Sequence, residues 1–147
     1  MKATSTVMTT AQTNKAIYVV DTHALVWYLT ADNKLSETAR LAIKEATSEQ
    51  AFLVIPAVVL AELFMIAEKQ RTTLVIPTLQ SIIQDWQASN HIILSDLTPQ
   101  LIIKSAAYTS IPDIFDRLIV TEAEGLDARI ITRDPVIAGI EQSRTIW

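Results

Sequence analysis

The sequence of 147 residues contains no cysteine, which excludes disulfide bonds, thiolate metal sites and cysteine nucleophiles. It contains only two glycines, Gly125 and Gly139, so it has no glycine-rich loop of the kind that surrounds a bound phosphate. No apolar run approaches the roughly 20 residues that a membrane-spanning helix needs. Half of the residues are nevertheless hydrophobic, which favours a globular, helix-rich domain over a disordered chain.

Basic residues are in the minority, because 12 Lys and Arg stand against 16 Asp and Glu and give a formal charge of −4. A protein with this charge does not hold nucleic acid by bulk attraction alone. A metal-loaded acidic pocket is locally less negative than the count suggests, so enzymes acting on nucleic acid are not excluded. The Thr- and Ser-rich start lacks the apolar centre of a secretory signal. We predict a flexible tail over 1–15, one domain over 16–147 and a cytoplasmic location.

Strand-like and helix-like segments alternate along the chain. Apolar, β-branched runs predict strands, and cap residues and prolines mark the starts of the helices between them. Thr22 is the predicted cap of the first helix, and Gly125 is predicted to end a later one in the left-handed conformation. The predicted strands cover 17–20, 51–55, 92–94 and 129–132, with 145–147 as an optional edge strand. This alternation predicts an α/β fold whose mostly parallel sheet is covered on both faces.

Two of the predicted strands are followed by a carboxylate, Asp21 after the first strand and Asp134 after the fourth. Ligands of such sheets bind beyond the carboxyl ends of the strands, so both acids are expected at one edge. Each acid also has an ordinary alternative role. Asp21 is placed to cap the next helix, and Asp134 before Pro135 is a common turn initiator.

Two further acids stand among apolar residues, where acidic side chains are rare unless they are paired. Glu62 lies within the apolar segment 58–66, and Asp116 follows Phe115. A structural ion pair remains an alternative for Glu62. An ion pair between Asp116 and its neighbour Arg117 is not expected, because adjacent helical residues do not face each other.

Four gathered carboxylates need a cation or shared protons, because two unit charges ~4 Å apart repel by roughly 4 kcal/mol at an effective dielectric of 20. Oxygen-only ligands favour Mg²⁺ or Mn²⁺. A metal-free pair of the aspartic-protease kind needs only two acids. The sequence therefore predicts a Mg²⁺ or Mn²⁺ site formed by Asp21, Glu62, Asp116 and Asp134. His23 is predicted to be a core histidine, and Asp113 to cap the Asp116 helix or to support the metal site indirectly.

The ordered set Val20-Asp21-Thr22, then Glu62, then Asp113-Ile-Phe-Asp116-Arg117-Leu-Ile, then Thr132-Arg-Asp134 resembles the PIN-domain family, and more closely the VapC-type toxins of prokaryotic toxin–antitoxin pairs. The resemblance extends from Ile17 to the C-terminus. Ile114 replaces the proline of the family's Pro-Phe-Asp-Arg segment, and Ile111 and Pro112 stand near the place of its histidine. These departures bear on the substrate loop and leave the four acids intact.

The resemblance implies a three-layer α/β/α fold with four or five strands and metal-dependent cleavage of RNA. It places the family's acidic quartet on the four acids named above, holding one or two Mg²⁺ or Mn²⁺ ions, with Glu62 or Asp134 orienting the attacking water. Supporting roles fall on Thr22, Asp113, Arg117 and Thr132. Candidates to hold phosphates, or simply surface charges, are Arg117, Arg133 and Lys104.

The resemblance also implies a homodimer and a cognate antitoxin as partner. Trp27, Tyr28, Phe64 and Met65, together with the apolar segment 76–86, exceed what one small core needs and are predicted to form an interface. Two other functions stay open. One is a non-catalytic PIN-like interaction module, and the other is a different Mg²⁺-dependent phosphotransfer enzyme. A haloacid-dehalogenase-type phosphatase, however, needs an acid where this chain has His23.

Overall fold

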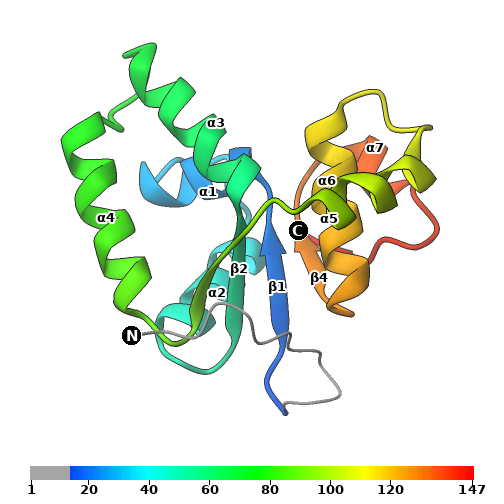
Figure 1. Ribbon diagram of the computed structural model, residues 1–147. Helices are drawn as coiled ribbons and strands as arrows, with labels where there is room; N and C mark the ends of the chain where they lie inside the picture. Colours follow the sequence, from blue (N-terminus) through cyan, green and yellow to red (C-terminus); the bar gives the residue numbers. More distant parts are fainter. Residues whose placement is uncertain (1–13) are drawn as a thin grey trace.

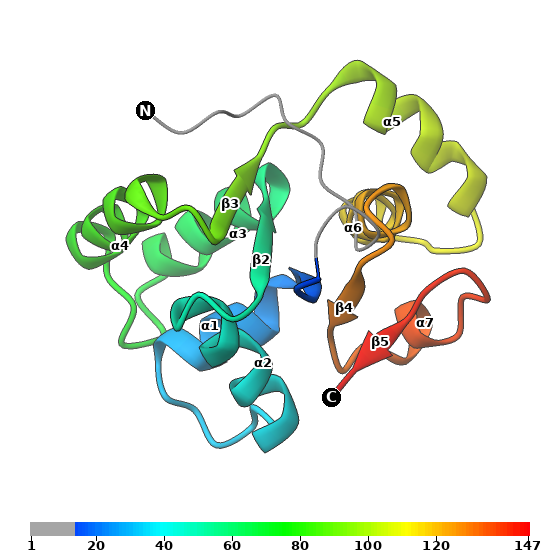
Figure 2. The same ribbon diagram turned by 90° about the horizontal axis from the view of Figure 1, so that it is seen from below.

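A computed structural model describes residues 14–147 of the chain. Its strands form a single parallel sheet in the order β3-β2-β1-β4-β5 (Figures 1 and 2). The strands are β1 (Ile17–Val20), β2 (Phe52–Pro56), β3 (Ile92–Ser95), β4 (Arg129–Ile131) and β5 (Thr145–Ile146). The optional edge strand therefore forms, and it pairs in parallel with β4.

Helices cover both faces of this sheet, which confirms the predicted three-layer α/β/α fold. They are α1 (Thr22–Leu29), α2 (Glu37–Thr47), α3 (Ala57–Glu68), α4 (Ile76–Ala88), α5 (Pro99–Ser105), α6 (Ile114–Gly125), α7 (Pro135–Ala138) and a 3₁₀ turn, η2 (Ala106–Tyr108). In Figure 2, α1 to α4 lie on one side of the sheet, and α5 and α6 lie on the other. Within the described residues, no helix has the length and apolar character needed to cross a membrane.

The central strands are buried on both faces, as expected for a parallel sheet between two helical layers. All four residues of β1 are buried, and Val19 and Val20 have no exposed surface. Leu63 of α3 and Ile119 of α6 pack into the same core from opposite layers. The continuous apolar character of the strands is therefore the direct consequence of their central position.

The strand order places a topological switch point at β1. After β1 the chain adds β2 and β3 on one side, and it then crosses to the other side of β1 for β4 and β5. At the carboxyl end of this junction the backbone N–H of Asp21 donates to the carbonyl of Ile131 over 3.1 Å. In open α/β sheets such a junction is the usual place for a ligand.

The predictions for two helix ends, the start of α1 and the end of α6, are wrong in detail. Asp21, not Thr22, is the N-cap of α1, and Thr22 is the first helical residue. Gly125 ends α6 without a positive φ, and the left-handed conformation falls on Asp127, which has a φ of 52°. Asn and Asp tolerate this region better than other residues with a side chain.

The predicted flexible tail lies outside the described residues except for its end. Within that end, the Lys15 ammonium donates to the carbonyl of Glu49 over 2.8 Å and lies 2.9 Å from Nε2 of His91. The last residue of the predicted tail therefore contacts the turn after α2 and the residue before β3.

The predicted surplus of apolar residues is mostly taken up by the core. In α4, Leu79 and Trp86 are buried, and Trp27, Tyr28 and Phe64 are partly buried against the core. The prediction that these residues exceed the needs of the core is therefore wrong for most of the set. Met65, 52% exposed, is the exception.

Candidate active site

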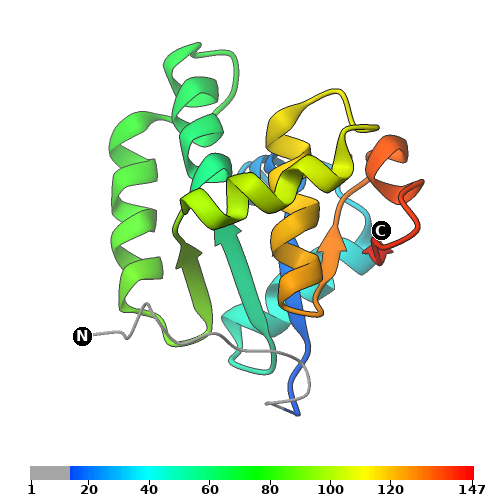
Figure 3. The same ribbon diagram turned by 45° about the vertical axis from the view of Figure 1, so that its right-hand side comes forward.

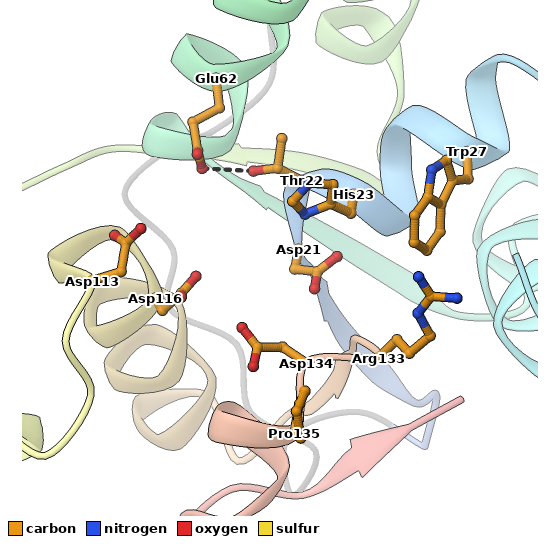
Figure 4. Close-up of a pocket in the computed structure, with 10 residues that line it drawn as sticks. All are labelled: Asp21, Thr22, His23, Trp27, Glu62, Asp113, Asp116, Arg133, Asp134 and Pro135. Atoms are coloured by element: carbon orange, nitrogen blue, oxygen red, sulfur yellow. Dashed lines mark hydrogen bonds between the residues drawn. The ribbon is translucent and has the colours of Figure 1, made fainter. Parts of the chain in front are cut away.

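A cleft of about 400 Å³ opens at the carboxyl ends of β1 and β4, and all four predicted acids line it (Figure 4). Its lining residues are Asp21, Thr22, His23, Trp27, Glu62, Asp113, Asp116, Arg133, Asp134 and Pro135. They come from the ends of two neighbouring strands and from the four helices α1, α3, α6 and α7 that follow or face them. Residues spread over more than a hundred positions of the sequence therefore meet in one place.

Asp21 lies at the floor of the cleft and is only 8% exposed. As the N-cap of α1, its Oδ1 accepts the N–H of Ala24 over 2.9 Å, and its Oδ2 accepts the hydroxyl of Thr132. Burial raises the pKa of Asp21, whereas these two hydrogen bonds act in the opposite direction. Capping and a place in the acidic cluster are thus compatible, because one side chain serves both.

Thr132 joins the ends of the two strands. Its side chain is buried, donates to Asp21 and accepts the backbone N–H of Asp134 over 3.0 Å. Asp134 in turn caps α7, with its Oδ1 accepting the N–H of Val136 over 2.8 Å. The predicted turn-forming role of Asp134 is therefore confirmed, and its carboxylate still faces the cleft (Figure 4).

Glu62 enters the cleft from α3, on the opposite side from Asp134. Its side chain is half-buried, and its Oε1 accepts the hydroxyl of Thr22 over 2.7 Å. No Lys or Arg of residues 14–147 lies within 4.0 Å of it, so the alternative of a structural ion pair is not supported. Thr22 therefore acts at the cleft as an orienting donor and not as a helix cap.

Asp116 shows the electrostatic strain of the cluster most directly. Its carboxyl group is half-buried on the first turn of α6, and its pKa is raised to about 7. Burial is the main cause, and repulsion from Asp113, Asp134, Glu62 and Asp21 adds to it. The ion pairs of the described residues join Arg40 to Glu37 and Arg144 to Asp127, both on the surface. No protein cation within residues 14–147 pairs with the cluster.

Asp113, the residue before α6, and Arg117, near the start of this helix, do not hold the cleft acids directly. Asp113 is exposed and caps α6 by accepting the N–H of Phe115 over 2.7 Å, as predicted. Arg117 donates from Nε to the carbonyl of Ile111 over 2.6 Å and does not line the cleft. Arg117 therefore braces the loop that carries Asp113.

Of the three predicted phosphate-binding candidates, Arg133 lies at the cleft, whereas Arg117 and Lys104 do not line it. The guanidinium of Arg133 lies 4.5 Å from the ring centre of Trp27. The prediction for His23 is wrong, because this residue is exposed and lines the cleft. His23 and Trp27 are four residues apart and so share one helix face, which was the available sequence signal for this wall.

The cluster has the chemistry of a site for a hard divalent cation. It offers carboxylate oxygens from four positions, and no Lys, Arg or His of residues 14–147 forms an ion pair with them. Within residues 14–147, however, no three acidic or imidazole side chains are gathered tightly enough to hold an ion as they stand. Binding would therefore require the side chains to move closer, which flexible Glu and Asp rotamers permit.

Comparisons with known proteins identify the family to which this chain is similar. Residues 18–141 match the family model of the PIN domain. Ribonuclease VapC22 of Mycobacterium tuberculosis (strain ATCC 25618 / H37Rv) is 31% identical over 135 residues, which span 88% of this chain and 97% of that protein.

Two solved structures share the fold at lower identity. The first is VapBC2 from Rickettsia felis bound to a DNA fragment from their promoter, with a TM-score of 0.65 and 18% identity over 88% of this chain and 97% of that one. The second is a toxin–antitoxin complex from Klebsiella pneumoniae, with a TM-score of 0.59 and 16% identity over 90% of this chain and 97% of that one. Because the family model spans most of the sequence and the acidic cleft lies inside it, the chain belongs to the PIN domain family.

Proposed function

We propose that the protein is a metal-dependent endoribonuclease that acts as the toxin of a toxin–antitoxin pair. The observation that carries this proposal is the cleft in which Asp21, Glu62, Asp116 and Asp134 face one another, with no Lys or Arg of residues 14–147 within 4.0 Å of their carboxylates. A binding module would gain nothing from such repulsion. A nuclease needs these carboxylates close together despite their repulsion, because they hold the cation that the reaction uses.

The four acids would hold one or two Mg²⁺ or Mn²⁺ ions, the cations that prefer oxygen ligands. When bound, such an ion lowers the pKa of water and stabilises the negative charge that develops at phosphorus. The protein's own contribution is to place the carboxylates. Thr132 fixes Asp21, Thr22 orients Glu62, and the cap of α7 fixes Asp134.

The remaining groups act on the water and on the substrate. Either Glu62 or Asp134 would orient the attacking water, since these two carboxylates approach the floor of the cleft from opposite sides (Figure 4). Arg133 is the lining residue with a permanent positive charge, and it is placed to contact a phosphate of the bound chain. Cleavage would then be an in-line displacement at phosphorus.

The proposals for the substrate and the partner are inferred from the relatives. Ribonuclease VapC22 supports RNA as the substrate, and the two structural neighbours are toxin–antitoxin assemblies. We therefore propose an antitoxin that covers the cleft and inserts an arginine or a similar cationic group among the carboxylates. Such a group would neutralise the cluster in the way that the metal ions do.

The decisive experiment is RNA cleavage by the purified, partner-free protein. We expect cleavage with Mg²⁺ or Mn²⁺ and none with EDTA. Asp21→Asn should lower the rate by more than about 100-fold, since the loss of an outer partner of a metal ligand alone costs about 10–100-fold. The matched control is Asp85→Asn, which makes the same change at an exposed position of α4 outside the cleft. It should cleave like the wild type.

The alternatives give different results. Full cleavage by Asp21→Asn, or cleavage in EDTA, would contradict the mechanism. Stabilisation of the fold by Mn²⁺ without cleavage of any RNA would indicate a non-catalytic PIN-like module. Hydrolysis of phosphomonoesters in place of RNA would indicate another phosphotransfer enzyme.

A further inference from the structure

One wall of the cleft is aromatic and cationic, although the rest of the cleft is acidic. The guanidinium of Arg133 lies over the indole of Trp27 at 4.5 Å from the ring centre. The edge of Trp147 packs against the same indole, with ring centres 5.8 Å apart and an interplanar angle of 68°. Figure 4 shows Arg133 reaching from the end of β4 toward Trp27, on the opposite side of Asp21 from Asp113 and Asp116.

The position of Arg133 is unexpected for an arginine beside an acidic cluster. It precedes Asp134 in the chain and shares the cleft with Asp21, yet within residues 14–147 it has no ion pair within 4.0 Å. Its guanidinium instead lies over an aromatic ring, a contact that arginine makes more often than lysine. Arg133 is itself exposed, so its N–H donors remain accessible from the cleft.

His23 extends this wall toward the floor of the cleft. It is exposed, lies one helical turn before Trp27, and its ring centre is 5.8 Å from that of the indole. The cleft wall thus carries three planar groups in a row, an imidazole, an indole and a guanidinium. Two of the three, His23 and Arg133, are exposed at the cleft.

We infer that His23, Trp27 and Arg133 form a stacking subsite for one nucleotide of single-stranded RNA, next to the phosphate that is cleaved. The inference rests on the proposed ribonuclease function and extends it to how the substrate is held. Single-stranded RNA is recognised by bases that stack on aromatic rings and on arginine planes. The guanidinium also supplies donors for the adjoining phosphate, which the acidic groups opposite would repel.

A purely structural role for the same residues makes a different prediction. Arg133 also lies 5.9 Å from the ring centre of Trp147 and so bridges two indoles at the end of β4. If this packing were its whole purpose, loss of Arg133 would lower the stability of the fold and leave the affinity for RNA unchanged.

The test measures binding of a fluorescent single-stranded RNA oligonucleotide by anisotropy, with Mg²⁺ present and Asp21→Asn as the non-cleaving background. In that background, Trp27→Leu and Arg133→Ala should each weaken binding by roughly 5- to 100-fold, the range of one lost stacking interaction. Trp27→Phe keeps a ring and should retain most of the affinity. Arg133→Lys keeps the charge but loses the plane, so it should bind more weakly than the control Arg71→Lys, an exposed arginine that does not line the cleft.

Thermal unfolding of every variant separates folding from recognition. If Trp27→Leu fails to fold, the two Arg133 variants decide, because they remove an exposed side chain and leave the core intact. Unchanged affinity for RNA in Arg133→Ala would overturn the subsite. So would equal affinity of the background protein for the intact oligonucleotide and for one with abasic sites. In either case, RNA cleavage by the wild type would still support the proposed function. Absence of both binding and cleavage in the wild type would overturn both.

Discussion

Asp116 is the residue whose ionisation responds most strongly to the gathering of the acids. In the folded, metal-free protein its pKa is about 7, against an ordinary value of 3.8. The folded state therefore keeps a proton over a range in which the unfolded chain has lost it. The penalty for ionising Asp116 is absent below about pH 4, grows as the pH rises toward about 7, and is complete above it.

Replacing Asp116 by Asn should remove this penalty. In EDTA at pH 8, Asp116→Asn should raise the free energy of unfolding by about 1–2 kcal/mol, a value already reduced for the solvent screening of a half-exposed group. At pH 4 the two proteins should be nearly equal. Urea unfolding at both pH values measures the difference, with Asp85→Asn as control. An equal effect at pH 4 and pH 8 would show that repulsion is not its origin.

At the scale of single residues the sequence was most informative where a charge stood in an apolar setting. Asp21, Glu62, Asp116 and Asp134 were all identified on that ground or from strand ends, and all line one cleft. The apolar neighbours of His23 predict a core position, whereas the side chain is exposed. Its exposure depends on which side of α1 the sheet covers, which a short apolar helix does not reveal.

Among the elements, α6 brings two acids to the cleft in different ways. Asp113 caps the helix and is exposed, whereas Asp116 lies one turn later, half-buried and facing the other carboxylates. The cap requires only an acceptor, which an amide also provides. The electrostatic role of Asp116 requires a charge.

The two positions should therefore differ when each is changed to Asn. Asp113→Asn should leave stability nearly unchanged, and it should reduce Mn²⁺ affinity or RNA cleavage by roughly 10–100-fold if Asp113 supports the metal indirectly. Asp116→Asn should cost more in both measurements. Calorimetric Mn²⁺ titration and cleavage rates for both variants provide the comparison. Full activity in Asp116→Asn with an inactive Asp113→Asn would mean that Asp113 is the metal ligand.

The order and type of the elements could be predicted because strands, caps and prolines alternate clearly. The boundaries were less predictable, since several residues satisfy the same local rule. Asp21 and Thr22 are both residue types that cap helices well. In the fold Asp21 is the cap and also accepts a hydrogen bond from Thr132, whereas Thr22 donates to Glu62, and both of these partners are far away in the sequence. Gly125 was likewise expected to adopt the left-handed conformation that Asp127 takes.

At the scale of the whole molecule, the apolar surface lies elsewhere than the sequence indicated. The exposed large apolar residues around α5 and the start of α6 are Leu97, Ile102, Ile103, Ile114 and Phe115. Figure 3 shows α5 and α6 packed together on one face of the molecule. Contiguous exposed apolar side chains of this kind commonly mark interfaces. The spacing of apolar residues in α4 is the same whether a helix face packs against the core or against a partner, so the sequence does not distinguish the two.

We expect a homodimer that uses this α5–α6 face. Light scattering at micromolar concentrations should give twice the monomer mass for the wild type. Ile103→Lys, at a side chain that is 71% exposed, should shift the mass toward the monomer without unfolding the protein. Met65→Lys, on the face that the sequence suggested, is the matched control and should stay dimeric. A monomeric wild type would contradict the predicted dimer. Dissociation by Met65→Lys but not by Ile103→Lys would show that the dimer uses the face that the sequence predicts, around Met65.

The hydrogen bond between Thr132 and Asp21 joins residues 111 positions apart. Parallel pairings with such separation close late in folding, because the intervening chain must first be brought together. During synthesis on the ribosome, the first acid emerges long before β4 exists to complete its surroundings. The growing chain therefore carries Asp21 through the synthesis of another 111 residues before Thr132 can hold its carboxylate, and the acidic site is not complete until Asp134 has been added.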